Sequence, residues 1–160
     1  MKGVKKVFVA VVLLIMLFPI HSYAQQARVD EYVAYCDEIG TRYGISSEML
    51  QAMCFYESSW NPSAVSSHGA IGLMQIKPDC HRDRMNRLGV TDLTDPYSNI
   101  LVGADILKEY SYKYEAYEAL VAYNCGEYSK TFRDALNGSS NRYADRILKK
   151  TRELEIQRGK

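Results

Sequence analysis

The stretch YESSWNPSAVSSHGAIGLMQIKP, residues 56–78, holds one carboxylate, Glu57, beside a segment rich in glycine and serine. Glu57 follows Cys54 by three residues and Leu50 by seven, so a helix places its carboxyl group on an apolar stripe. Burial disfavours the charged form of a carboxyl group and therefore raises its pKa. A carboxyl group that keeps its proton near neutral pH can act as a general acid, and we predict this chemistry for Glu57.

Apolar residues recur at helical spacing along the chain and predict a mainly α-helical domain with little or no sheet. The segment 61–78 is expected to be a shaped loop with a short extended piece at 73–76, and the charged tail 149–160 is expected to fray. The expected helices cover residues 27–43, a segment from a cap at Ser46 or Ser47 to Asn61, then 79–88, 96–110, 115–124, 127–136, and a last helix that contains Tyr143, Ile147 and Leu154.

Residues 1–24 have the three parts of a secretory signal: lysines at the start, an apolar run over 7–20, and small residues up to Ala24. We expect cleavage after Ala24, which leaves residues 25–160 as one domain in the periplasm or cell wall, with no membrane contact. An uncleaved membrane anchor is the alternative, although the run is short for a span of about 20 residues.

The charge balance argues against a nucleic acid partner. The chain has 20 lysines and arginines against 19 acids, and residues 1–24 contain three of the lysines and none of the acids. The remaining domain therefore has 17 basic side chains against 19 acidic ones, which gives no excess of positive charge for a phosphate backbone.

The four cysteines all follow the predicted signal, and an even number of cysteines in an exported chain suggests disulfides. Three pairings of Cys36, Cys54, Cys80 and Cys125 are possible, and the sequence does not select one. Free, buried thiols are the alternative. A zinc site is less expected, because no closely spaced Cys/His set occurs.

Three motifs occur in order along the chain: ESSWNPSAVSSHGAIGLMQIKP, DPYSNILVGADIL and ALVAYNCG. In this order and at these separations they resemble the soluble lytic transglycosylase domain, whose fold is similar to that of goose-type lysozyme. The resemblance covers about residues 45–148. It implies a lysozyme-like helical bundle with a groove for the glycan strands of peptidoglycan, and it implies no metal and no diffusible cofactor.

The resemblance also implies which residues form the site. Glu57 matches the family's catalytic acid. Tyr123 could hydrogen-bond the Glu57 carboxyl group and keep it oriented, with core packing as the alternative. The residues that match substrate-contacting positions of the family are Ser66, Met74, Gln75, Tyr123 and Asn124.

The reaction implied by the resemblance needs a single acid. An ordinary glycosidase uses two carboxylates, but Asp79 and Asp83, the nearest acids, lie outside the three motifs. In the family's reaction the glutamate protonates the glycosidic oxygen between N-acetylmuramic acid and N-acetylglucosamine. The muramyl N-acetyl group stabilises the cationic centre, and the ionised glutamate then deprotonates the C6 hydroxyl, which closes a 1,6-anhydro ring.

Two other functions fit the same residues. One is a goose-lysozyme-like muramidase that hydrolyses the same bond with water, and the other is a non-catalytic peptidoglycan-binding scaffold. The chain shows no anchoring or wall-binding module, so it also resembles the short transglycosylases that open the wall locally for secretion, conjugation or pilus machinery. General wall turnover is the alternative role.

Overall fold

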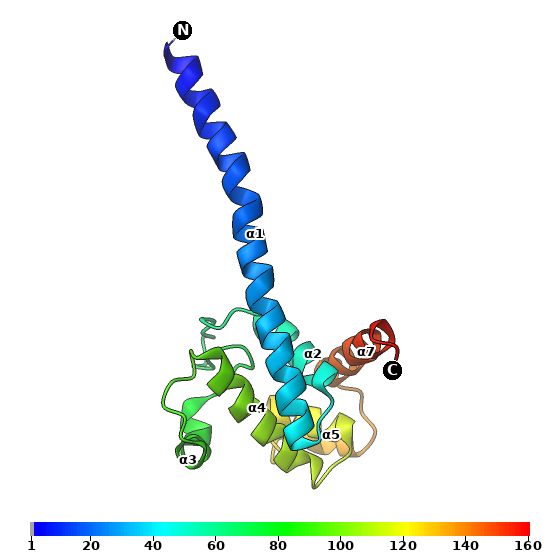
Figure 1. Cartoon of the computed structure of the whole chain (residues 1–160). Coiled ribbons are helices and arrows are strands. Elements are labelled where there is room, and N and C mark those ends of the chain that lie inside the picture. Colours follow the sequence, from blue (N-terminus) through cyan, green and yellow to red (C-terminus); the bar gives the residue numbers. More distant parts are fainter. Residues whose placement is uncertain (1) are drawn as a thin grey trace. The chain divides into compact units, whose positions relative to one another are not determined.

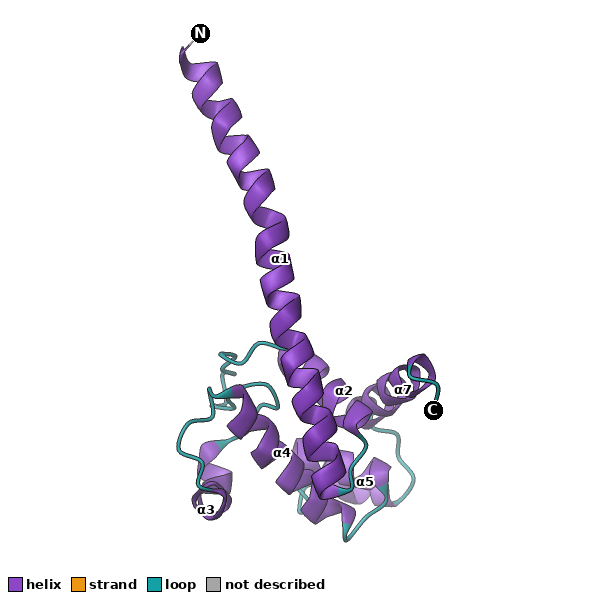
Figure 2. Ribbon diagram, in the orientation of Figure 1, coloured by secondary structure: helices purple, strands orange, loops and turns teal. Residues whose placement is uncertain are grey.

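The computed structural model describes the backbone of residues 2–160 and the side chains of residues 23–160. Over the described backbone the chain forms seven helices and no strand, which confirms the predicted mainly α-helical fold (Figures 1 and 2). The helices are α1 (Lys2–Tyr43), α2 (Ser47–Ser58), α3 (Pro78–Leu88), α4 (Pro96–Ser111), α5 (Ala116–Cys125), α6 (Lys130–Leu136) and α7 (Arg142–Gln157).

The chain divides into two compact units, residues 1–32 and residues 33–160, and the second holds every feature described below. The predicted signal peptide 1–24 falls, except for its last two residues, outside the side chains that the structure describes, and it stays a prediction. Within the described side chains, we find no helix both long enough and apolar enough for a transmembrane segment.

Capping residues account for the helix boundaries. At the start of α2 the Ser46 side chain accepts a hydrogen bond from the Met49 backbone N–H. Asp95 accepts one from the Ser98 N–H in the same way at the start of α4. Gly89 ends α3 in the left-handed conformation, with φ of +70°. These groups satisfy backbone donors and acceptors that a helix end leaves free, so the local sequence sets each boundary.

The core lies between α2, α4, α5 and α7. α2 packs against α7, and α5 packs against α4, α6 and α7. Leu50 and Met53 of α2, Ile100 of α4, Leu120 of α5 and Ile147 of α7 are all fully buried. Because most residues from Ser47 to Cys54 are buried, packing fixes the direction in which α2 leads to its last turn.

Asn99 of α4 holds the loop between α2 and α3 against the core. Its side chain is fully buried, and its Nδ2 donates hydrogen bonds to the carbonyl oxygens of Ile71 and Leu93, at 2.8 and 2.9 Å. Its Oδ1 accepts a hydrogen bond of 2.7 Å from the Met74 backbone N–H. One side chain therefore satisfies three backbone groups that would otherwise be buried without partners.

Two glycines allow this close packing of the loop on α4. A Cβ atom on Gly72, whose φ is +80°, would lie 2.2 Å from Asn99 Nδ2. On the α4 side, a Cβ atom on Gly103 would lie 2.4 Å from the sulfur of Met74. Any larger residue at either position would push the loop away from the helix.

The prediction of a short extended piece at 73–76 is wrong. The backbone N–H and carbonyl groups of Ile71 and Ile76 bond to each other, at 2.9 Å in both directions, so the intervening residues form a tight turn. Gln75, with φ of +50°, completes this turn. The apolar side chains in the segment that suggested a strand are buried by the turn instead.

The prediction of a frayed tail is also wrong, because α7 continues to Gln157 and the residues after it bind Glu48. Glu48 is only 2% exposed, and it accepts hydrogen bonds from Arg158, at 3.1 Å, and from Lys160, at 2.7 Å. Burial opposes ionisation of Glu48, but the bond from Lys160 and further hydrogen bonds outweigh it and lower the pKa to about 2. The stabilisation from this lowered pKa is present above the ordinary value of 4.5 and is lost as the pH falls toward 2.

We expect Asn99→Leu to lower the free energy of unfolding by about 3 kcal/mol, because it leaves three buried backbone groups without partners. The measurement is urea denaturation followed by circular dichroism. Asn86→Leu on the exposed side of α3 is the matched control and should change the free energy by less than about 0.5 kcal/mol. Equal effects of the two substitutions would contradict the role assigned to Asn99.

Candidate active site

Glu57 lies in the last turn of α2, where the chain changes direction sharply. The next residues, Ser59 and Trp60, have left-handed backbone conformations with φ of +52° and +62°. Ser58 Oγ donates a hydrogen bond of 2.9 Å to the carbonyl oxygen of Leu73, which joins the end of α2 to the loop. The carboxyl group of Glu57 is thus held at the boundary between a packed helix and a turn.

A tyrosine from the last helix contacts this carboxyl group. Tyr143 of α7 donates its hydroxyl hydrogen to Glu57 Oε1 at 2.7 Å. Burial raises the pKa of Glu57, and the hydrogen bond from Tyr143 partly opposes this effect because it stabilises the ionised form. Burial also raises the pKa of Tyr143 well above its ordinary value, so the phenol keeps its proton and remains a donor.

The sequence left two roles open for Tyr123, a hydrogen bond to Glu57 or core packing, and the structure shows no hydrogen bond from Tyr123 to Glu57. The Tyr123 hydroxyl donates to the backbone carbonyl of Met74 at 2.8 Å, on the loop opposite α5. Tyr123 still lies close enough to Glu57 for the carboxylate charge to raise its pKa, after the larger effect of burial. The sequence places Tyr143 in the last predicted helix, and its spacing within that helix carries no sign of a partner 86 residues away.

A cleft of about 550 Å³ opens beside Glu57. The predicted residues Ser66, Gln75, Tyr123 and Asn124 all line it, so the fold brings together residues from α2, the loop and α5. The wall also contains residues that the motifs did not mark, namely Lys77, Cys80, His81, Tyr110 and Cys125. Among the described residues that line this cleft, Glu57 is the only carboxylate.

Met74 does not line the cleft, and its predicted contact with a substrate needs correction. Its side chain is fully buried and lies against Gly103 of α4. A fully buried side chain cannot touch a ligand in the cleft. Met74 acts instead through its backbone, whose N–H is bound by Asn99 and whose carbonyl oxygen is bound by Tyr123.

Ser66 and Gln75 shape the wall as well as line it. The hydroxyl oxygen of Ser66 accepts hydrogen bonds from the backbone N–H groups of His68 and Ala70, at 3.3 and 3.0 Å. The side-chain amide of Gln75 donates to the carbonyl oxygen of Gly72 at 3.0 Å. Both polar side chains are therefore fixed by the loop that presents them to the cleft.

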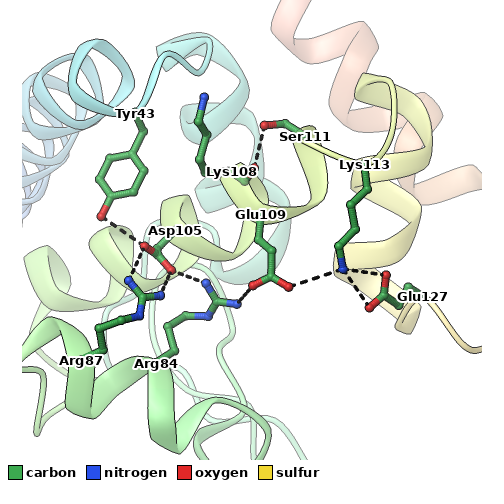
Figure 3. A network of polar contacts seen from close by, with 9 residues as sticks. All are labelled: Tyr43, Arg84, Arg87, Asp105, Lys108, Glu109, Ser111, Lys113 and Glu127. Atoms are coloured by element: carbon green, nitrogen blue, oxygen red, sulfur yellow. Dashed lines mark hydrogen bonds and ion pairs between the residues drawn. The ribbon is translucent and has the colours of Figure 1, made fainter.

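A network of charged side chains lies along α3 and α4 and continues to the segment after α5 (Figure 3). Asp105 of α4 pairs with Arg84 and Arg87 of α3, and Arg84 also pairs with Glu109. Lys113 joins Glu109 to Glu127, at 3.6 and 3.2 Å. The network connects the helix that carries Cys80 and His81 with the segment that follows Cys125, so it braces one wall of the cleft.

The four cysteines, all within the described residues, have free thiols, so the predicted disulfides are absent from the structure. Cys36 and Cys54 are buried in the core. Cys80 and Cys125 lie on the wall of the cleft.

Comparison with known families gives a match over most of this unit. The family described as the transglycosylase SLT domain matches residues 34–145, which is more than half of the chain. The chain belongs to the transglycosylase SLT domain family. The matched residues include Glu57 and Tyr143 together with every residue that lines the cleft.

Relatives of this SLT domain include proteins of different sizes. The chain is 34% identical over 87 residues to the endo-type membrane-bound lytic murein transglycosylase A of Klebsiella pneumoniae, and it spans 43% of the length of that protein. It is 32% identical over 115 residues to protein IpgF of Shigella flexneri, an alignment that covers 67% of this chain and 75% of IpgF.

The 70 kDa soluble lytic transglycosylase of Escherichia coli has the same fold. Its crystal structure superimposes with a TM-score of 0.62 at 24% sequence identity, over 77% of this chain and 24% of that one. The SLT domain described here therefore has the helical, lysozyme-like fold that the motifs predicted.

We expect Tyr143→Phe to raise the pKa of Glu57 further, because the hydrogen bond that favours the ionised carboxylate is lost while the burial remains. Carbon-13 NMR titration of the glutamate carboxyl groups measures this pKa directly. Tyr43→Phe, which removes a hydroxyl facing Asp105, is the matched control and should leave the titration of Glu57 unchanged. An unchanged or lowered pKa in Tyr143→Phe would contradict the assignment.

Proposed function

We propose that this protein is a peptidoglycan lytic transglycosylase. It would cleave the β-1,4 bond between N-acetylmuramic acid and N-acetylglucosamine with formation of 1,6-anhydromuramic acid. The observation that carries the proposal is the half-buried Glu57, held by Tyr143 in an SLT-domain cleft that has no second carboxylate among its described lining residues. The names of the Klebsiella and Escherichia relatives support the same activity.

The raised pKa of Glu57 suits the first step, in which a protonated acid is needed. Glu57 gives its proton to the glycosidic oxygen, and the bond from that oxygen to C1 of the muramyl residue breaks. The N-acetyl oxygen of the same sugar stabilises the positive charge that develops at C1. The substrate thereby supplies the group that a second carboxylate supplies in an ordinary glycosidase.

The ionised Glu57 then acts as a base in the second step. It accepts the proton of the C6 hydroxyl while O6 forms a bond to C1, which closes the anhydro ring and restores the protonated acid. Tyr143 can keep its hydrogen bond to the carboxyl group in both states, so the group does not need to rotate between the steps. Neither a cofactor nor a water molecule is consumed in this sequence.

Four residues of the cleft are proposed to bind the glycan strand. Ser66 and Gln75 come from the loop, while Tyr123 and Asn124 come from the end of α5, so they face the cleft from two sides. Glycan strands present hydroxyl and N-acetyl groups, which side chains of these types can bind through hydrogen bonds. The absence of other acids from the described wall fits a substrate whose peptide stems carry carboxylates.

We also propose that the protein is exported and acts on the cell wall. Residues 1–24 would be removed as a signal peptide, leaving residues 25–160 as the active domain. Opening of the wall for a secretion, conjugation or pilus system is the proposed role. The likeness to protein IpgF extends over 67% of this chain and 75% of that protein.

The deciding experiment is the digestion of peptidoglycan, with mass spectrometry of the soluble products. We expect products that carry anhydromuramic acid, which are lighter than hydrolytic products by one water, about 18 Da. Glu57→Gln should lower the rate by about 10²- to 10⁴-fold, the usual contribution of a general acid. Glu115→Gln, at an exposed position before α5, is the matched control and should retain full activity.

The products also separate this proposal from the alternatives. Reducing-end muramic acid would indicate a muramidase that uses Glu57 and water. Binding of peptidoglycan without any product, by a correctly folded protein, would indicate a scaffold.

The pH dependence of the reaction follows from the state of Glu57. The free enzyme must carry the proton, so we expect kcat/KM to fall as the pH rises through the raised pKa of Glu57. Tyr143→Phe should move this fall to higher pH, and it should also lower kcat because the carboxyl group is less well oriented. Measuring kcat and kcat/KM from pH 4 to pH 8, with Tyr43→Phe as control, tests both effects. If kcat/KM of Tyr143→Phe fell at the same pH as that of the wild type, the expected shift would be contradicted.

A further inference from the structure

Cys36 of α1 and Cys54 of α2 are both buried in the core. Both side chains have 0% exposed surface. Cys36 contributes to the raised pKa of the Cys54 thiol, after the larger effect of burial, so the two thiols lie near each other. We propose that these two cysteines are the native disulfide pair of the protein, and that Cys80 and Cys125 are bonded to neither of them.

Two close approaches between α1 and α2 near these cysteines support this pairing. A Cβ atom on Gly40 would lie only 3.1 Å from the Cβ atom of Ser47. One turn earlier on α1, Asp37 accepts a hydrogen bond of 3.4 Å from Gln51 of α2. The two cysteines continue this series of facing positions, so their contact belongs to the whole helix interface and is not a chance approach of two side chains.

The positions of the other cysteines argue against the remaining pairings. Cys80 is exposed near the start of α3, and Cys125 is at the end of α5, where its sulfur contacts the Val121 carbonyl oxygen and the Ser129 hydroxyl. Both line the cleft. Pairing either of them with Cys36 or Cys54 would require a core helix to move into the cleft, whereas the proposed pair needs no change of fold.

The bond would form by thiol–disulfide exchange with a protein disulfide or with oxidised glutathione. One cysteine thiolate attacks the donor disulfide and gives a mixed disulfide, and the second cysteine then displaces the donor. The donor leaves as two thiols, so it takes up the two electrons and the two hydrogens that the cysteines lose. Burial, together with the contact with Cys36, raises the pKa of Cys54 well above its ordinary value, so exchange should occur during folding, before the pair is enclosed.

The proposed disulfide would join α1 to the helix that carries the catalytic acid. Cys54 is three residues before Glu57, almost one turn away on the same helix. A link at this point restricts the unfolded chain and holds the α1 and α2 interface together. The proposed pairing depends only on the positions of the thiols and does not depend on the proposed reaction.

The test is refolding of the full chain from urea in a glutathione redox buffer, followed by alkylation of free thiols and peptide mapping. Trypsin alone would leave Cys54 and Cys80 in one peptide, because Pro78 follows Lys77, so a second digestion with a glutamate-specific protease is needed. We expect a linked peptide pair that joins Cys36 to Cys54. Reductant should release this pair and lower the melting temperature by about 10 °C.

Two variants make the test specific. The double variant Cys80→Ser and Cys125→Ser should keep both the linked pair and the effect of reductant on melting. Cys36→Ala should melt at the same temperature with and without reductant. Alkylation of all four cysteines after oxidative refolding, or a link from Cys36 or Cys54 to Cys80 or Cys125, would overturn the proposal.

Discussion

The structure depends on how a buried loop satisfies its backbone hydrogen bonds. The turn after Gly72 lies against the core, where an unpaired N–H or carbonyl group is costly. Three helices each supply one polar side chain to this turn: Ser58 from α2, Asn99 from α4 and Tyr123 from α5. Each of these bonds fixes the loop and one wall of the cleft at the same time, so the shape of the site follows from the requirement to pair buried backbone groups.

The electrostatics of the site depend on charges that are kept away from Glu57. An unpaired cation beside a carboxyl group lowers its pKa, which would deprive an acid of its proton. Arg84 lies close enough to Tyr123 for its charge to oppose slightly the rise in the pKa of that phenol, but Arg84 is paired with Asp105 and Glu109 (Figure 3). Burial has the largest effect on the pKa of Glu57, and the hydrogen bond from Tyr143 opposes it.

Most of the fold could be predicted from the sequence, because local signals determine it. The caps Ser46 and Asp95 and the terminal Gly89 act within one turn of the chain, so their effect is visible in a short segment. The long-range pairs could not be predicted. Glu48, an acid in the first turn of a helix, has the sequence pattern of a solvated side chain, and only packing shows that it is buried and paired with the tail.

The predicted site residues show the same difference between what a local signal predicts and what packing decides. Four of the five residues predicted to contact a substrate line the cleft, because a motif preserves local geometry. Met74 belongs to the same motif, yet the turn at Gln75 directs neighbouring side chains to opposite sides, one to the core and one to the cleft. A motif therefore identifies the segment, while the backbone conformation decides which of its side chains is available to a ligand.

The contact between Glu57 and Tyr143 has a consequence for the order of assembly. The two residues are 86 positions apart, and the phenol comes from the last helix. α7 packs on both α2 and α5, so it docks on elements that precede it in the chain. A polypeptide emerging from its amino end presents the glutamate first and the tyrosine much later, so the acid acquires its orienting partner only after α7 has emerged and docked.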